Sequence, residues 1–146
     1  MRLTWRPLTA LALLVAVLSA SGCLADPQRV QMTRLFDQLV DARSALSEQP
    51  PRTDPACDAV GEVSSRLYGE PGLEDVRPAW ATLRSATHAL QAVCGQQRLL
   101  SQPFEPTAAM LGGRARWQQG ISVELGLACQ HLADAASALA KVAPTC

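Results

Sequence analysis

The stretch VRPAWATLRSATHALQAVC, residues 76–94, decides the fold. Its mostly apolar positions recur in steps of four, three, four, three and four residues: Val76, Trp80, Leu83, Thr87, Leu90 and Cys94. Steps of this kind place side chains along one side of an α-helix, where packed helical bundles bury them. We therefore predict a helix that begins near Asp75 and ends at Gly95, with Pro78 within its first turn.

The residues before this stretch predict two further helices. A helix over about 27–48 begins at Asp26-Pro27, because aspartate accepts bonds from free helix amides and proline suits the first helical position. Its predicted buried residues are Met32, Leu35, Phe36, Leu39, Ala42 and Leu46. The next helix repeats this start signal at Asp54-Pro55 and ends at Gly69. Its predicted buried residues are Cys57, Val60, Val63 and Leu67.

The residues after the stretch predict a break and a last helix. Prolines interrupt the pattern within residues 96–113, and we interpret Gly112-Gly113 as a hinge between helices. The last helix covers about 114–142, with a predicted buried stripe of Trp117, Ile121, Leu125, Ala128, Cys129, Leu132, Ala136 and Leu139. The predicted fold class is all-α: a small up-and-down helical bundle of about four helices, stapled by two disulfides, in a single domain of residues 27–146.

The first 22 residues have the layout of a secretory signal peptide. Arg2 and Arg6 form a positive start, an apolar run of 11 residues follows from Leu8 to Leu18, and small residues come next. Because a membrane-spanning helix needs about 20 apolar residues, we predict a removable leader over residues 1–22 rather than a permanent span. The protein is therefore expected to be exported.

The segment Ser19-Ala20-Ser21-Gly22-Cys23 resembles the lipobox of bacterial lipoprotein precursors, although Ala20 stands where that class usually has leucine. The resemblance implies cleavage before Cys23, a diacylglycerol on its thiol, and a short tether over residues 23–26. The expected location is then the cell envelope, on the outer face of a bacterial membrane, held through the lipid anchor. The alternative is cleavage by an ordinary signal peptidase after Ala25, which would give a freely secreted protein.

Charge gives no indication of a nucleic-acid partner. Loss of Arg2 and Arg6 with the leader leaves 11 basic and 13 acidic residues in the remaining 124, a net charge of −2. Nucleic-acid binding domains usually carry a strong excess of clustered positive charge. We therefore expect no nucleic-acid binding.

Removal or lipidation of Cys23 leaves four cysteines, an even number in an oxidising compartment. In an up-and-down bundle the start of the second helix lies beside the end of the third, so we predict Cys57–Cys94. Cys129–Cys146 follows by elimination. A helix continuing to residue 142 would rise about 20 Å from Cys129, and the short tail barely returns that far. The rival pairing, Cys57–Cys129 with Cys94–Cys146, therefore stays open.

The chain carries no motif for a nucleophile, a nucleotide or a metal, so we predict no catalytic residue, no metal ligand and no cofactor. The hypothesis is a non-enzymatic binding or interaction module whose partner is another envelope protein or a small apolar ligand. A freely secreted binding protein and a hydrolase inhibitor are alternatives. A further alternative is an extracytoplasmic metal-handling protein or enzyme that uses His88 and His131.

Overall fold

The computed structural model describes residues 26–103 and 107–146. The predicted leader and Cys23 lie outside these described residues. Within them the chain forms four α-helices and one short 3₁₀ helix: α2 (Pro27–Ser47), α3 (Thr53–Gly69), η1 (Leu73–Asp75), α4 (Ala79–Ser101) and α5 (Ala108–Leu139).

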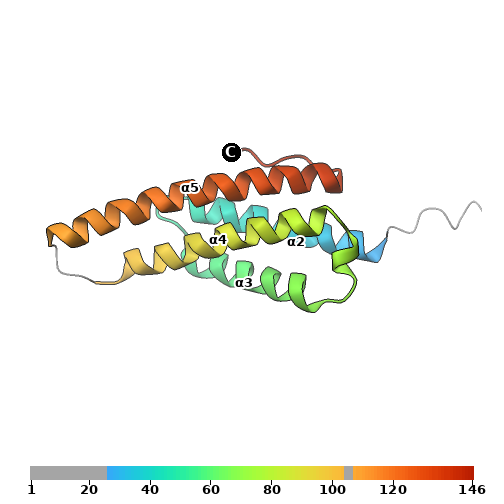
Figure 1. Ribbon diagram of the computed structural model, residues 1–146, viewed down its shortest axis with the longest axis horizontal. Helices are drawn as coiled ribbons and strands as arrows, with labels where there is room; N and C mark the ends of the chain where they lie inside the picture. The colour runs from blue at the N-terminus through green and yellow to red at the C-terminus, as the bar shows by residue number, and fades with distance from the viewer. Residues whose placement is uncertain (1–25, 104–106) are drawn as a thin grey trace, which may run out of the picture.

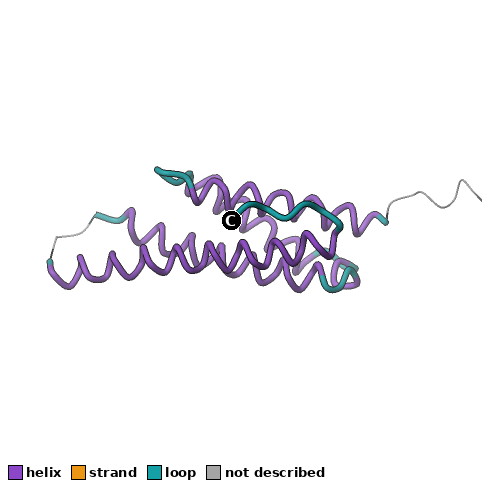
Figure 2. The backbone as a smooth tube through the Cα atoms, turned by 90° about the horizontal axis from the view of Figure 1, so that it is seen from above, coloured by secondary structure: helices purple, strands orange, loops and turns teal. Residues whose placement is uncertain are grey.

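The four helices run alternately up and down and pack into one bundle (Figures 1 and 2). Each helix packs against the next one in the chain, and α2 also packs against α5, which closes the bundle. This is the predicted all-α fold class, and the prediction is confirmed.

Helix α4 lies at the centre of the packing, because it contacts α2, α3 and α5. It buries the following residues: Ala79, Leu83, Ala86, Thr87, Ala89, Leu90, Val93 and Cys94. Leu83 and Leu90 are fully buried, and each contributes about 1.5–3 kcal/mol on burial. The buried arc is wider than the predicted stripe because α3 and α5 cover two sides of α4. The Thr87 hydroxyl is satisfied within the helix, since it donates to the Leu83 carbonyl at 2.8 Å.

The Asp-Pro sequence signal predicted the start of α2 correctly but not the start of α3. At α2, Asp26 accepts a hydrogen bond from the Gln28 amide at 3.0 Å with Pro27 in the first turn, so the predicted start is confirmed. At α3, the N-cap is Arg52 and the helix begins at Thr53, so the start predicted from Asp54-Pro55 was wrong by two residues. Asp54 instead lies in the first turn, where a carboxylate interacts favourably with the positive end of the helix.

Helix α4 differs from its predicted bounds at both ends. The 3₁₀ turn occupies Leu73–Asp75, α4 begins at Ala79, and Pro78 is its N-cap. The predicted end at Gly95 was wrong, because the helix continues to Ser101. A glycine in a helix costs only about 1 kcal/mol, and packing of this segment against α5 offsets that cost.

The predicted hinge at Gly112-Gly113 was also wrong. Helix α5 begins at Ala108 and runs without interruption through both glycines. Its start is fixed by Thr107, whose hydroxyl oxygen accepts from the Met110 amide at 3.3 Å. The cap satisfies one of the free amides of the first turn, so the helix starts before the glycines instead of after them.

Helix α5 ends at Leu139, earlier than the predicted residue 142. Ala140 adopts a left-handed conformation with φ 56° and ψ 40°. The Ala140 amide donates to the Ser137 carbonyl at 3.3 Å, and the Lys141 amide to the Ala136 carbonyl at 2.8 Å. This pair of bonds is a Schellman motif, which satisfies the last helical carbonyls and turns the chain back. The seven residues 140–146 then return over the bundle (Figure 1).

We expect the substitution Ala140→Gly to stabilise the protein by about 0.5–1 kcal/mol, because glycine adopts positive φ without a steric penalty. Urea denaturation with both disulfides intact measures this difference. Ala143→Gly is the matched control in the same tail, where φ is not positive. An equal or smaller free energy of unfolding for Ala140→Gly would contradict the assigned motif.

Candidate functional site

The two disulfides join different parts of the bundle. Cys57–Cys94 links the first turns of α3 to α4, with Cα atoms 5.8 Å apart. Cys129–Cys146 links the middle of α5 to the last residue of the chain, with Cα atoms 6.0 Å apart. The pairing is the one predicted, and it does not contain the rival links. The early end of α5 explains why Cys146 reaches Cys129: the returning tail is longer than the sequence pattern suggested.

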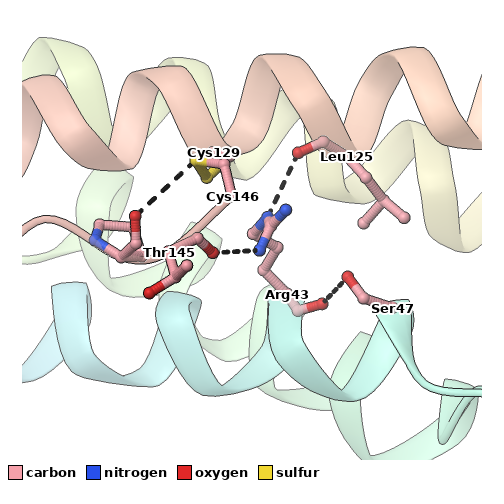
Figure 3. Close-up of a disulfide and its surroundings, with 7 residues drawn as sticks. Arg43, Ser47, Leu125, Cys129, Thr145 and Cys146 are labelled. Carbon is pink, nitrogen blue, oxygen red and sulfur yellow. Dashed lines mark hydrogen bonds between the residues drawn. A yellow bond between two sulfur atoms is a disulfide. The ribbon is translucent and has the colours of Figure 1, made fainter.

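Side chains from α2 hold the tail in place (Figure 3). The half-buried Arg43 donates from Nη1 to the Thr145 carbonyl and from Nε to the Leu125 carbonyl, each at 3.3 Å. Its guanidinium therefore joins the tail to α5. We call Arg43, Leu125, Cys129, Thr145 and Cys146 the tail-docking residues.

A second contact holds the start of the tail. Lys141 Nζ lies 2.9 Å from Asp37 Oδ1, and it also lies over the Phe36 ring, 5.9 Å from the centroid. Asp37 on the exposed face of α2 is therefore the partner of the lysine in the tail. Exposed ion pairs of this kind contribute about 0–1 kcal/mol, so the disulfide and Arg43 carry most of the docking.

A second candidate region is the end of the bundle where α4 and α5 extend beyond α2 and α3 (Figure 1). Thr53, the first residue of α3, bonds to Gln97 at 3.4 Å, and Gly120 lies against the Gln96 side chain. Residues 98–101 of α4 and 108–119 of α5 therefore lie beyond these neighbours. We call these two segments the overhang. Arg114 ties them together, because its Nη1 donates to the Leu100 carbonyl at 3.3 Å.

The overhang combines apolar and positively charged surface. Leu99, Met110 and Leu111 are 42%, 39% and 54% exposed. The segments carry three arginines, Arg98, Arg114 and Arg116, and no aspartate or glutamate. Trp117 is half-buried beside them. Arginine, tryptophan and methionine are enriched at the centres of protein interfaces, where lysine and carboxylates are depleted.

The histidine singled out in the third predicted helix belongs to an aromatic cluster between α3 and α4. The Tyr68 hydroxyl lies 2.8 Å from His88 Nε2 and accepts from Arg84 Nε at 3.1 Å. The Arg84 guanidinium lies over the rings of Trp80 and Tyr68, at 4.4 Å and 4.9 Å from their centroids. The Trp80 indole donates to the Leu67 carbonyl at 2.9 Å. These contacts join α4 to α3.

His131 lies half-buried on α5, on a different helix from the Tyr68–His88 cluster. Among residues 26–103 and 107–146, no group of three or more His, Cys, Asp or Glu side chains could hold a metal ion. In the same described ranges, no helix has the length and apolar character that a membrane crossing requires.

One ion pair perturbs the titration of its members. At the turn after α2, Arg52 donates from Nε to Glu48 Oε2 at 2.7 Å. This hydrogen bond lowers the pKa of Glu48 and raises the pKa of Arg52. Both side chains are exposed, so the pair closes the turn without marking a catalytic site.

The surface depression nearest the overhang lies between the loop before α3 and the end of α4. It is lined mostly by polar and charged side chains, among them Arg52, Asp54, Gln97 and Arg98. An apolar groove would favour a small apolar ligand, and this depression does not have that character.

The sequence patterns identified the four paired cysteines. They did not indicate that Arg43 docks the tail, or that residues of the overhang form an exposed surface. Arg43 lies off the apolar stripe of α2, and only the returning tail gives it acceptors. Leu99, Met110 and Leu111 fell in the segment with the weakest pattern.

Comparison of the chain with models of known protein families gave no match. Comparisons with curated proteins and with solved structures also gave none.

We expect the substitution Arg43→Gln to lower the free energy of unfolding by about 1–2 kcal/mol, because it removes two hydrogen bonds from a half-buried charged donor. Urea denaturation of the oxidised protein measures the effect. Arg34→Gln is the matched control on the same helix, since Arg34 is exposed, and its effect should stay within about 0.5 kcal/mol. Equal effects of the two substitutions would show that Arg43 does not dock the tail.

Proposed function

We propose that the protein is an exported, lipid-anchored, non-enzymatic cell-envelope protein that acts as an interaction module through the overhang. The leader over residues 1–22 and the lipobox-like segment ending at Cys23 support export and anchoring. The two disulfides are compatible with an oxidising compartment.

The observation that carries the proposed binding role is the uncovered surface of the overhang. Leu99, Met110 and Leu111 belong to the segments of α4 and α5 that form the overhang, and their side chains are exposed. The described core is closed by buried residues from all four helices, which favours a partner at the surface over a ligand inside the bundle. An exposed apolar group with a charged rim is a common docking surface for proteins.

The position of the overhang fits an anchored protein. The start of α2, drawn in blue, lies at the other end of the bundle (Figure 1). Helix α5 has 32 residues and is about 48 Å long at 1.5 Å per residue. An anchor at Cys23 would therefore allow the overhang to face away from the membrane, toward other envelope components.

The charge of the overhang indicates the chemistry of the partner. Its three arginines favour an acidic protein surface with an apolar centre. The same charge disfavours self-association through this surface, because two copies would place like charges together.

Intact mass of the protein from membrane and medium fractions of its native host tests the anchor. We expect a membrane-bound species that begins at Cys23 and carries a diacylglycerol, and we expect Cys23→Ala to move the protein to the medium. A wild-type species that begins near Asp26 in the medium would overturn anchoring and leave the secreted alternative.

Photocrosslinking in the native host tests the overhang. A photoreactive amino acid at Leu111 should give a protein adduct, and Glu62 on α3 provides an exposed control position. The double substitution Arg98→Glu/Arg116→Glu should reduce the adduct at least about tenfold, because reversed charges oppose an acidic partner. Arg34→Glu/Arg77→Glu makes the same change of net charge at exposed sites outside the overhang and should have little effect.

Adducts with phospholipid alone, or adducts that both double substitutions change equally, would contradict an acidic protein partner.

A further inference from the structure

The two disulfides differ in their access to solvent. Cys57 and Cys94 are buried, at 7% and 6% exposed, and they line a surface depression together with Asp58, Gln91 and Arg98. Cys129 is also buried, at 1% exposed, whereas Cys146 is exposed. A disulfide is cleaved by direct attack of a thiolate on one of its sulfurs, so access decides which bridge reacts.

Access also decides which sulfur is attacked. Cys129 is buried on α5, with Arg43 and Thr145 nearby (Figure 3). Beyond the disulfide, the exposed Cys146 makes only a long contact, 3.8 Å, from its sulfur to the Pro144 carbonyl. An incoming thiolate therefore reaches the Cys146 sulfur and displaces Cys129 as the leaving thiolate.

We propose that Cys129–Cys146 is a thiol–disulfide exchange site for a protein dithiol. The first thiolate of the dithiol bonds to Cys146 Sγ, the Cys129–Cys146 bond breaks, and Cys129 leaves as a thiolate. The second thiolate then attacks the sulfur of its own protein in the mixed disulfide and releases Cys146. The dithiol is oxidised to a disulfide, and Cys129 and Cys146 are reduced and take up protons from solvent. The reverse sequence, with an oxidised partner, forms the bridge.

Exchange at this site releases the tail and leaves the bundle intact. No residue of the tail, 140–146, belongs to the buried core. After reduction, the Arg43 bond to Thr145, the ion pair between Lys141 and Asp37 and the contact of Lys141 with the Phe36 ring remain. The exposed ion pair is individually weak, so the Arg43 bond is the main contact that still docks the tail. The buried Cys57–Cys94 bridge continues to join α3 to α4. The site is independent of the proposed binding function of the overhang.

Dithiothreitol treatment of the purified, oxidised protein under native conditions tests the difference in access. Alkylation at timed intervals and peptide mass analysis identify which thiols have appeared. We expect Cys129 and Cys146 to be reduced at least about 10-fold faster than Cys57 and Cys94, because Cys57 and Cys94 are both buried residues whereas Cys146 is exposed. Equal rates, or faster reduction of Cys57–Cys94, would overturn the proposal.

A thioredoxin that lacks its second active-site cysteine tests access by a protein and the direction of attack. It should be trapped as a mixed disulfide on Cys146 and not on Cys129, because only Cys146 is exposed. The Cys146→Ser variant should give no adduct while it keeps the helical circular dichroism of the wild type. Attachment at Cys129, or no trapped complex, would overturn the proposal.

The tail contacts provide a graded test of the same site. Arg43→Gln should increase the rate of Cys129–Cys146 reduction about 3- to 10-fold, since it loosens the tail around the attacked sulfur. Arg34→Gln should leave the rate unchanged. Equal rates in all three proteins would show that tail docking does not control access.

Discussion

Burial of α4 against the three other helices is the constraint on which the rest of the structure depends. The alternating steps of three and four residues place Leu83, Leu90 and Cys94 along one side of the helix, and the small residues Ala86 and Ala89 allow close approach at its flanks. Because α3 and α5 pack on two sides, the order around the bundle follows the order in the chain. The same packing brings Cys57 next to Cys94, so the disulfide reinforces an arrangement that burial already favours.

The C-terminal tail depends on a single backbone reversal. Ala140 takes a left-handed conformation that costs free energy for any residue with a Cβ atom. The two hydrogen bonds of the Schellman motif, donated by the amides of Ala140 and Lys141, offset this cost. The reversal directs the chain back toward Cys129. There Arg43 donates hydrogen bonds both to the Leu125 carbonyl on α5 and to the Thr145 carbonyl on the tail. The tail is thus attached by one covalent bond and a few polar contacts. Its attachment is chemically separable from the stability of the core.

The overhang results from the unequal lengths of the helices. Helix α5 has 32 residues and α3 has 17, so α4 and α5 lose their other neighbours beyond Gln97 and Gly120. Side chains that would have been covered by α2 or α3 remain at the surface there. The exposed Leu111 and the arginines of the same segments are the physical basis of the proposed binding surface. The start of α5 lies at the end of the bundle remote from the start of α2 (Figure 1).

The amino-acid sequence by itself determined the fold class, the buried stripes of α2 and α3 and the start of α2. These follow from helical periodicity and from the Asp26-Pro27 cap, which are local properties of the chain. The sequence favoured the observed disulfides but left a rival pairing open, and the early end of α5 decided between them. The sequence did not determine the ends of α4 and α5, because Gly95 and Gly112-Gly113 carry costs of about 1 kcal/mol each that packing between α4 and α5 outweighs. Only the tertiary structure decided the roles of Arg43 and the overhang. The carbonyls that accept from Arg43 lie more than 80 residues away in the chain. The overhang exists because α2 and α3 do not extend along the whole length of α4 and α5.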